Sequence, residues 1–135
     1  LNGNGRRQDF HHPLYPRNSN TYFEPGDSSV EEMISSINYG VLVSNLDFGM
    51  EDPISGAVQC NSRYGFLIEN GEKSQKIKGV ALTGDSLLYL QAIDGISNSI
   101  EKFEGFHSRK GREDIVPVSF GGPYIKINRA IVGPG

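Results

Sequence analysis

The chain has 135 residues, of which 36% are apolar and 21% charged, and its formal net charge is −3. These values predict one globular domain with a single core. No apolar run approaches the ~20 residues of a membrane helix, and no secretory signal is visible. The mild acidity argues against nucleic-acid binding, which usually requires a basic face. The single cysteine, Cys60, excludes an intramolecular disulfide framework and favours a reducing compartment such as the cytoplasm.

Residues 11–27 are predicted to be extended, because prolines at positions 13, 16 and 25 push the preceding residues out of the helical region. A helix is predicted next, over about residues 29–38. A capping box is available from Ser28 with Glu31 or from Ser29 with Glu32. The apolar residues of this helix have the spacing i, i+3, i+4, i+7 and are Val30, Met33, Ile34 and Ile37.

Strands are predicted over residues 41–46 and, from the alternation in "ISGAVQCN", over residues 54–61. Asn70-Gly71 lies between two further strand-like runs, and this dipeptide supplies the positive φ values of a type I′ turn. The runs 63–69 and 73–82 are therefore expected to pair as an antiparallel hairpin.

A second helix is predicted near residues 86–93, with Asp85 or Ser86 as its N-cap and with Leu87, Leu90 and Ile93 on one face. Residues 101–106 are expected to be extended, and residues 123–132 form the last predicted strand. The total is two short helices and about six strands. This arrangement indicates an α+β domain with a curved, mostly antiparallel sheet.

Three histidines, His11, His12 and His107, are the candidate metal ligands. His107 is predicted to lie in a loop over Gly105–Gly111, ahead of a Gly-Gly-Pro turn ending at Pro123. A catalytic zinc needs about three protein ligands, and adjacent His11 and His12 would point in opposite directions if extended. A zinc site made by this chain alone is therefore not expected.

Several segments, in order, resemble the C-terminal domain of the TldD/PmbA family. They begin with Gly-Asn-Gly-Arg-Arg and continue with "PRNSNTYFEPGD", "ISGAVQCNSRYGFLIENGE", "KGVALTGDSLLYLQAIDGISN" and "VPVSFGGPYIKI". The resemblance implies that residues 1–135 form a single domain, the C-terminal half of a longer two-domain protein. It also implies a cytoplasmic metallopeptidase that acts on peptides or unfolded proteins, as a homodimer or as a heterodimer with a paralogue. Some relatives carry the description "modulator of DNA gyrase".

The resemblance also implies a zinc site shared between two domains. A His-Glu-x-x-x-His helix of the N-terminal domain supplies two ligands in this family, and a cysteine in a loop of the C-terminal domain supplies a third. "GFHSRKGR" is similar to that loop, and His107 stands roughly in register with the cysteine. His107 is thus the expected metal ligand, with zinc bound only when the N-terminal domain is present. Arg17, Asn20 and Thr21 match the family segment and are expected to line the substrate cleft.

Two functions remain open at this point. The first is the C-terminal domain of a zinc metallopeptidase, inactive by itself. The alternative is a non-catalytic partner or scaffold subunit of the same family that binds no metal. Neither function is expected to involve nucleic acid or a membrane, and an apolar surface normally covered by the N-terminal domain or by a second subunit is expected to be exposed.

Overall fold

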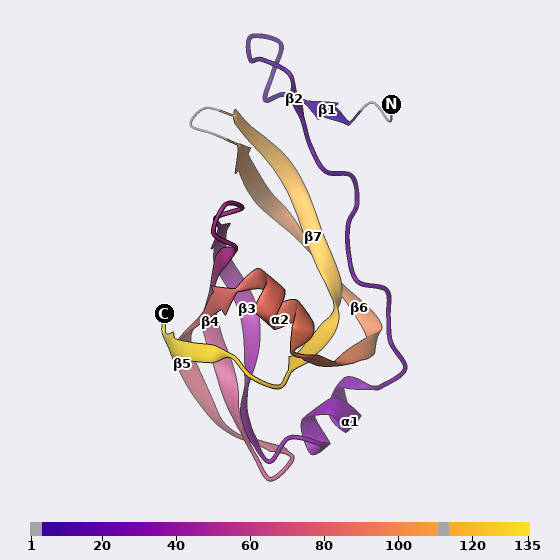
Figure 1. Cartoon of the computed structure of the whole chain (residues 1–135), viewed down its shortest axis with the longest axis vertical. Coiled ribbons are helices and arrows are strands. Elements are labelled where there is room, and N and C mark those ends of the chain that lie inside the picture. The colour runs from indigo at the N-terminus through magenta and orange to yellow at the C-terminus, as the bar shows by residue number, and fades with distance from the viewer. Residues whose placement is uncertain (1–3, 111–113) are drawn as a thin grey trace.

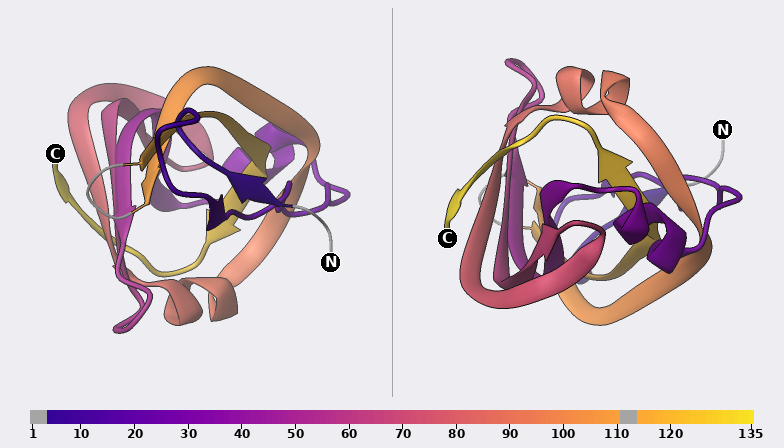
Figure 2. Two further views of the ribbon diagram at one scale, coloured as in Figure 1. Left: turned by 90° about the horizontal axis from the view of Figure 1, so that it is seen from above. Right: turned by 90° about the horizontal axis from the view of Figure 1, so that it is seen from below.

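The computed structural model describes residues 4–110 and 114–135 (Figure 1), and they form mostly antiparallel strands with two short helices, as predicted. One sheet has the strand order β3-β4-β5-β8, while β6 pairs with β7 as a long ribbon and β1 pairs with β2. The elements are β1 (Gly5–Arg6), β2 (Tyr15–Pro16), α1 (Val30–Ser35), β3 (Tyr39–Glu51), β4 (Ala57–Glu69), β5 (Glu72–Asp85), α2 (Ser86–Gln91), β6 (Ile93–Lys110), β7 (Asp114–Ile127) and β8 (Ile131–Pro134). Figure 2 shows the sheet and the ribbon curving around a common interior.

The β4–β5 hairpin confirms the prediction made from Asn70-Gly71. Both residues have positive φ, 51° and 82°, and Glu69 pairs with Glu72 across the turn. The strand predicted over residues 54–61 is wrong at its start, because residues 52–56 form the turn that links β3 to β4. The remainder joins the run 63–69 in one continuous strand, β4.

Helix α1 begins at the predicted capping box. The Ser29 hydroxyl accepts from the backbone N–H of Glu32 at 3.1 Å, and the Glu32 carboxylate accepts from the Ser29 N–H at 2.7 Å. The helix is shorter than predicted: Ser36 is its C-cap, and the chain then turns, with the Ile37 N–H donating to the Ile34 carbonyl at 3.0 Å. The N–H of Gly71 donates to the carbonyl of Ile37 at 2.8 Å.

Helix α2 begins at Asp85, whose carboxylate accepts from the N–H groups of Leu87 and Leu88 at 2.9 and 3.0 Å. The predicted helical face does not form as a unit, because Ile93 is already the first residue of β6. Leu87 and Leu90 lie on the outside of the helix, and α2 buries none of its residues.

The β6–β7 ribbon corrects two predictions. Residues 105–110 belong to β6, so His107 lies in a strand opposite Pro117 and not in a loop; Gly111 is outside the described residues. The Gly-Gly-Pro segment is also strand, since Gly121 pairs with Lys102. A Cβ at Gly121 would lie 2.2 Å from the Glu101 carbonyl oxygen, so this glycine permits close approach of two strands.

The last predicted strand, residues 123–132, is two strands. β7 ends at Ile127, and β8 leaves the ribbon to pair with β5, where Ile131 lies opposite Thr83. The Asn128 N–H donates to the Ala92 carbonyl at 3.0 Å and fixes this change of direction.

The described residues bury few apolar side chains, namely Met33, Ile34, Ile68, Val80, Ala81 and Val116. Ser97 of β6 is fully buried with its hydrogen bonds satisfied. Its hydroxyl accepts from the Tyr124 N–H at 2.8 Å and donates to the Ser99 carbonyl at 3.0 Å. Neither helix of the described chain has the length and apolar composition needed to cross a membrane.

Candidate functional site

The predicted metal ligand His107 lies on β6, toward the free end of the β6–β7 ribbon, and its side chain is exposed. The next residue along β6, Ser108, pairs with the buried Val116 of β7. The position is therefore held by strand pairing on a packed ribbon, which orients a side chain better than a loop does.

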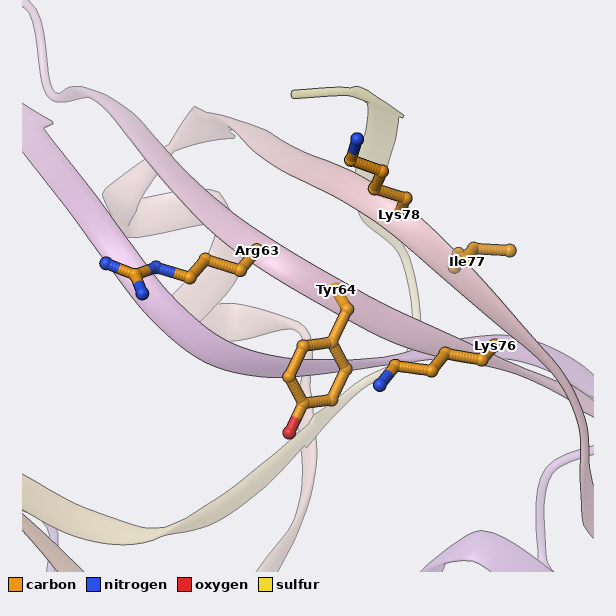
Figure 3. Close-up of a pocket in the computed structure, with 5 residues that line it drawn as sticks. All are labelled: Arg63, Tyr64, Lys76, Ile77 and Lys78. Atoms are coloured by element: carbon orange, nitrogen blue, oxygen red, sulfur yellow. The ribbon is translucent and has the colours of Figure 1, made fainter.

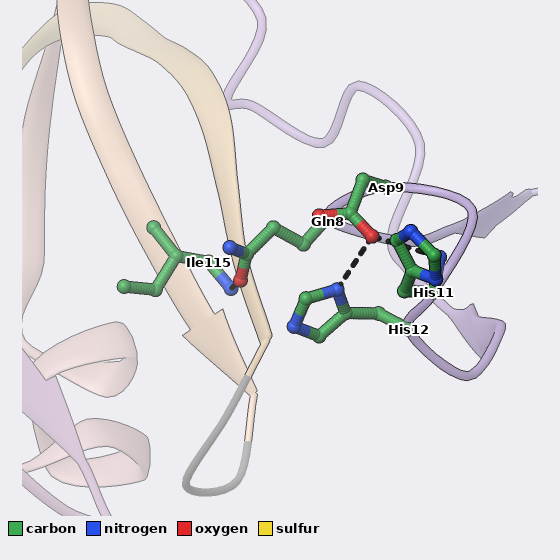
Figure 4. Close-up of polar contacts among 5 residues, drawn as sticks. All are labelled: Gln8, Asp9, His11, His12 and Ile115. Carbon is green, nitrogen blue, oxygen red and sulfur yellow. Dashed lines mark hydrogen bonds and ion pairs between the residues drawn. The ribbon is translucent and has the colours of Figure 1, made fainter.

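The other two histidines lie in the N-terminal segment, in the turn between β1 and β2 (Figure 4). One oxygen of the Asp9 carboxylate accepts from the His11 backbone N–H and from the His12 Nδ1, both at 2.8 Å. These hydrogen bonds, of which the one from the His12 side chain is the strongest, lower the pKa of Asp9 below its ordinary value. The Nε2 atom of His12 is left for another partner.

The N-terminal segment is attached to the ribbon at two places. Near the free end of the ribbon, the Gln8 side-chain oxygen accepts from the Ile115 N–H at 3.2 Å (Figure 4), and Ile115 pairs with Arg109, two residues along β6 from His107. At the other end, the Gly26 N–H donates to the Ser97 carbonyl at 2.9 Å. The structure thus brings the segment with His11 and His12 to the end of the ribbon that carries His107.

The predicted cleft residues lie between these two attachments. Arg17 is half-buried, and its backbone N–H donates to the Asn4 carbonyl at 2.9 Å. Asn20 and Thr21 are exposed, and the Thr21 hydroxyl lies 3.4 Å from the Ser19 carbonyl oxygen. This strip of extended chain runs beside the ribbon (Figure 1), and the segment that contains it is hydrogen-bonded to the ribbon at Gln8 and at Gly26.

The described residues do not form a complete zinc site. Among residues 4–110 and 114–135, no three His, Cys, Asp or Glu side chains are close enough to hold one metal ion. Cys60 lies elsewhere, on β4, where burial raises the pKa of its thiol and so disfavours the thiolate that zinc requires. An exposed histidine on a fixed strand does fit a different role, as one ligand of a site whose other ligands come from outside the described residues.

Sequence reasoning missed a polar pair on the ribbon. The Tyr124 hydroxyl donates to the Glu101 carboxylate at 2.8 Å. Burial and this neighbouring carboxylate raise the pKa of Tyr124 to about 12, so the phenol keeps its proton and remains a hydrogen-bond donor. The ribbon register pairs Glu101 with Gly122, two residues before Tyr124, and this register could not be read from the sequence because of the bulges in β6.

A hollow of about 410 Å³ on the sheet was also not predicted (Figure 3). It is lined by Arg63, Tyr64, Lys76, Ile77 and Lys78. The Lys76 ammonium lies 4.0 Å from the centre of the Tyr64 ring, a stabilising cation–π contact. Figure 3 shows Arg63 and Lys78 directed away from this pair, and Arg63 is bound to Asp47 at 2.9 Å. Because the cations diverge, the hollow has the character of a solvated sheet face.

Residues 1–134 match the family model of the PmbA/TldA metallopeptidase C-terminal domain. The chain belongs to this family. It is 37% identical over 131 residues to a metalloprotease of Methanothermobacter thermautotrophicus, covering 97% of this chain and 28% of that protein. It is 34% identical over 132 residues to the zinc metalloprotease TldD homolog of Saccharolobus solfataricus, covering 97% of this chain and 29% of that protein.

Among solved structures, TldE from Thermococcus kodakarensis superposes with a TM-score of 0.67 at 22% identity, over 96% of this chain and 27% of that one. At this identity the superposition shows a shared fold. The chain thus spans less than a third of the length of these relatives.

Proposed function

We propose that this chain is the C-terminal domain of a TldD-type zinc metallopeptidase that cleaves peptides or unfolded proteins, and that it contributes one metal ligand, His107, and part of the substrate cleft. The observation that carries the proposal is the place of His107. It is exposed on a strand near the end of a rigid ribbon, in a chain that belongs to a metallopeptidase family. The name of the Saccharolobus relative, a zinc metalloprotease, supports zinc as the metal.

The ligand count supports a shared site. Catalytic zinc takes three protein ligands and keeps one position open, whereas the described residues contain no group of three candidate ligands. The remaining ligands belong, on this proposal, to the part of the family polypeptide that this chain does not span. When bound, zinc would polarise a peptide carbonyl and lower the pKa of a coordinated water to about 7.

The protein's own contribution is then binding and orientation. Arg17, Asn20 and Thr21 border the ribbon along the fixed N-terminal segment, where exposed polar side chains can bind the backbone of an extended peptide. Tyr124 stays protonated near neutral pH and is held by Glu101. We further propose that the full protein works in the cytoplasm, which the single cysteine supports, and that it is a dimer, as the family resemblance implies.

The test is a graft in which this chain replaces the 131 matched residues of the Methanothermobacter metalloprotease. We expect the graft to bind about one zinc per chain and to hydrolyse an unfolded protein such as reduced casein. His107→Ala should remove most zinc and activity, and His107→Cys should keep the metal, since thiolate and imidazole are both zinc ligands. Asn20→Ala should keep zinc but raise KM. Equal zinc and equal activity in the parent graft and both His107 variants would contradict the role given to His107.

A non-catalytic partner subunit of the same fold is the second candidate. It is favoured by one observation, the histidine that stands where the resemblance places a cysteine. If the Methanothermobacter protein binds zinc and the graft does not, while the graft with His107→Cys recovers it, this second function is supported.

A further inference from the structure

The chain exposes more surface than a domain of its mass should. A monomeric globular protein of 14.8 kDa exposes roughly 7000 Å², whereas this one exposes 10001 Å². The excess is about 3000 Å². Part of it belongs to the extended N-terminal segment. The rest includes large apolar side chains, which an isolated domain usually covers.

A group of these exposed apolar side chains lies around α2. Five of them form what we call the leucine surface: Ile54 (96% exposed), Leu87 (65%), Leu88 (64%), Leu90 (51%) and Ile131 (68%). They come from the turn over residues 52–56, from α2 and from β8, and none of them carries a charge. Figure 2 shows α2 at the periphery of the molecule.

The leucine surface is built from three segments fixed to one another. The Ser86 N–H at the start of α2 donates to the Gly56 carbonyl of the turn at 2.8 Å. On the inner side of α2, the Tyr89 hydroxyl donates to the Thr83 carbonyl of β5 and accepts from the Ile131 N–H of β8 at 3.3 Å. The apolar side chains are therefore presented on a rigid support.

Helix α2 is short and has an apolar outer face. α2 has six residues, and isolated helices shorter than ~12–15 residues are marginal in water. Its inner face is held by Tyr89, but its outer face carries three leucines where a solvent-facing helix would carry charged or polar residues. An apolar outer face is typical of a helix that another part of a protein covers.

The length of the relatives suggests what covers the leucine surface. This chain spans only 28% of the Methanothermobacter protein, so most of a family polypeptide of that length is available to pack against it. The described part of the N-terminal segment is hydrogen-bonded to the ribbon, at Ile115 and Ser97.

We propose that the leucine surface is the docking surface for the remainder of a full-length family polypeptide, which packs an apolar face against α2, β8 and the turn over residues 52–56. This contact does not depend on zinc or on His107. Because α2 follows β5 and β8 pairs with β5, the contact would fix the position of the β3-β4-β5-β8 sheet relative to the rest of the polypeptide.

The test compares amide hydrogen exchange in the isolated 135-residue chain and in the Methanothermobacter graft. We expect the amides of residues 87–92 to exchange at least about tenfold more slowly in the graft, because docking removes local opening of α2. The variant Leu87→Glu with Leu90→Glu should lose this protection in the graft. Leu46→Glu, an exposed leucine of β3 at the opposite edge of the sheet, should keep it.

The same double variant in the isolated chain should keep its melting temperature within about 2 °C, since glutamate and leucine have similar helix propensities and the leucines are exposed. Unfolding of that variant would overturn the proposal, because the leucines would then be core residues. Equal exchange of α2 in the graft and in the isolated chain would also overturn it. Protection that appears in the isolated chain and rises with concentration would assign the surface to a second copy instead.

Discussion

The two helices have the same length and opposite surroundings. α1 and α2 are each six residues long, and each begins at a side chain that caps it. α1 buries Met33 and Ile34 against β6 and β5, whereas α2 buries nothing and exposes its leucines. Capping is a local property and is the same in both. Burial depends on what lies opposite the helix, and no described residue covers the outer face of α2.

The largest expected difference is in the cost of shortening an apolar side chain. Ile34→Ala should lower the free energy of unfolding of the isolated chain by about 2–4 kcal/mol, because it leaves a cavity in the core. Leu90→Ala should change it by less than about 0.5 kcal/mol, as expected of a surface position. Urea unfolding followed by circular dichroism measures both. Similar costs for the two substitutions would remove the distinction between the helices.

The next largest effect should come from the contact that fixes α1 to the sheet. Gly71 has φ +82°, and a Cβ there would lie 2.8 Å from the Ser35 carbonyl oxygen at the end of α1. Gly71→Ala should therefore cost about 1–2 kcal/mol for the left-handed backbone, with more from the clash. Gly122→Ala is the control, since its Cβ would meet no atom within 4 Å. Thermal unfolding of both variants checks this, and the account fails here if the control is the more damaging change.

Removing the caps should have smaller and similar effects on the two helices. Ser29→Ala and Asp85→Ala each leave N–H groups without their acceptor and should each cost about 1 kcal/mol in helix stability. The consequences should differ, because loss of α1 uncovers the core and loss of α2 does not. We expect the first variant to lower the global melting temperature more than the second, with amide exchange reporting local fraying of α2 in the second. An equal drop in melting temperature would mean that α2 covers core in this chain.

The smallest effect should be a pH dependence of α1. Hydrogen bonds from the Ser29 backbone and side chain hold the pKa of Glu32 below its ordinary value of 4.5. Because the folded value is the lower one, the stabilisation is complete above the unfolded pKa and is lost as pH falls through the folded value. Between about pH 6 and pH 3 the parent should lose more stability than Glu32→Gln, in which this group does not titrate. Parallel pH profiles for the two proteins would contradict the capping box.

Sequence reasoning succeeded where the signal is local. Asn70-Gly71 determined a turn, and Ser29 and Asp85 determined helix starts, because the atoms that form these features are within a few residues of one another. It failed for Gly121, which was predicted to lie in a turn. Gly121 instead permits the close approach of β6 and β7, and its contact is with Glu101, twenty residues away. It failed for Leu87 and Leu90 because helical spacing identifies an apolar face but not its partner.

The site shows the same division. The residue types of His107, Arg17, Asn20 and Thr21 could be selected by resemblance, while their placement required the ribbon register and the two attachments of the N-terminal segment. The hydrogen bond between Tyr124 and Glu101 depends on the bulges of β6 and could not be found from spacing.

X-ray absorption at the zinc edge of the graft tests the proposed role of His107 most directly. Zinc–nitrogen distances are about 2.0–2.1 Å and zinc–sulfur distances about 2.3 Å, so the spectrum identifies the atom that position 107 supplies. We predict that His107→Cys replaces one nitrogen in the zinc shell of the parent graft with one sulfur at about 2.3 Å. Identical zinc shells in the parent and in His107→Cys, at equal zinc content, would show that this position does not hold the metal.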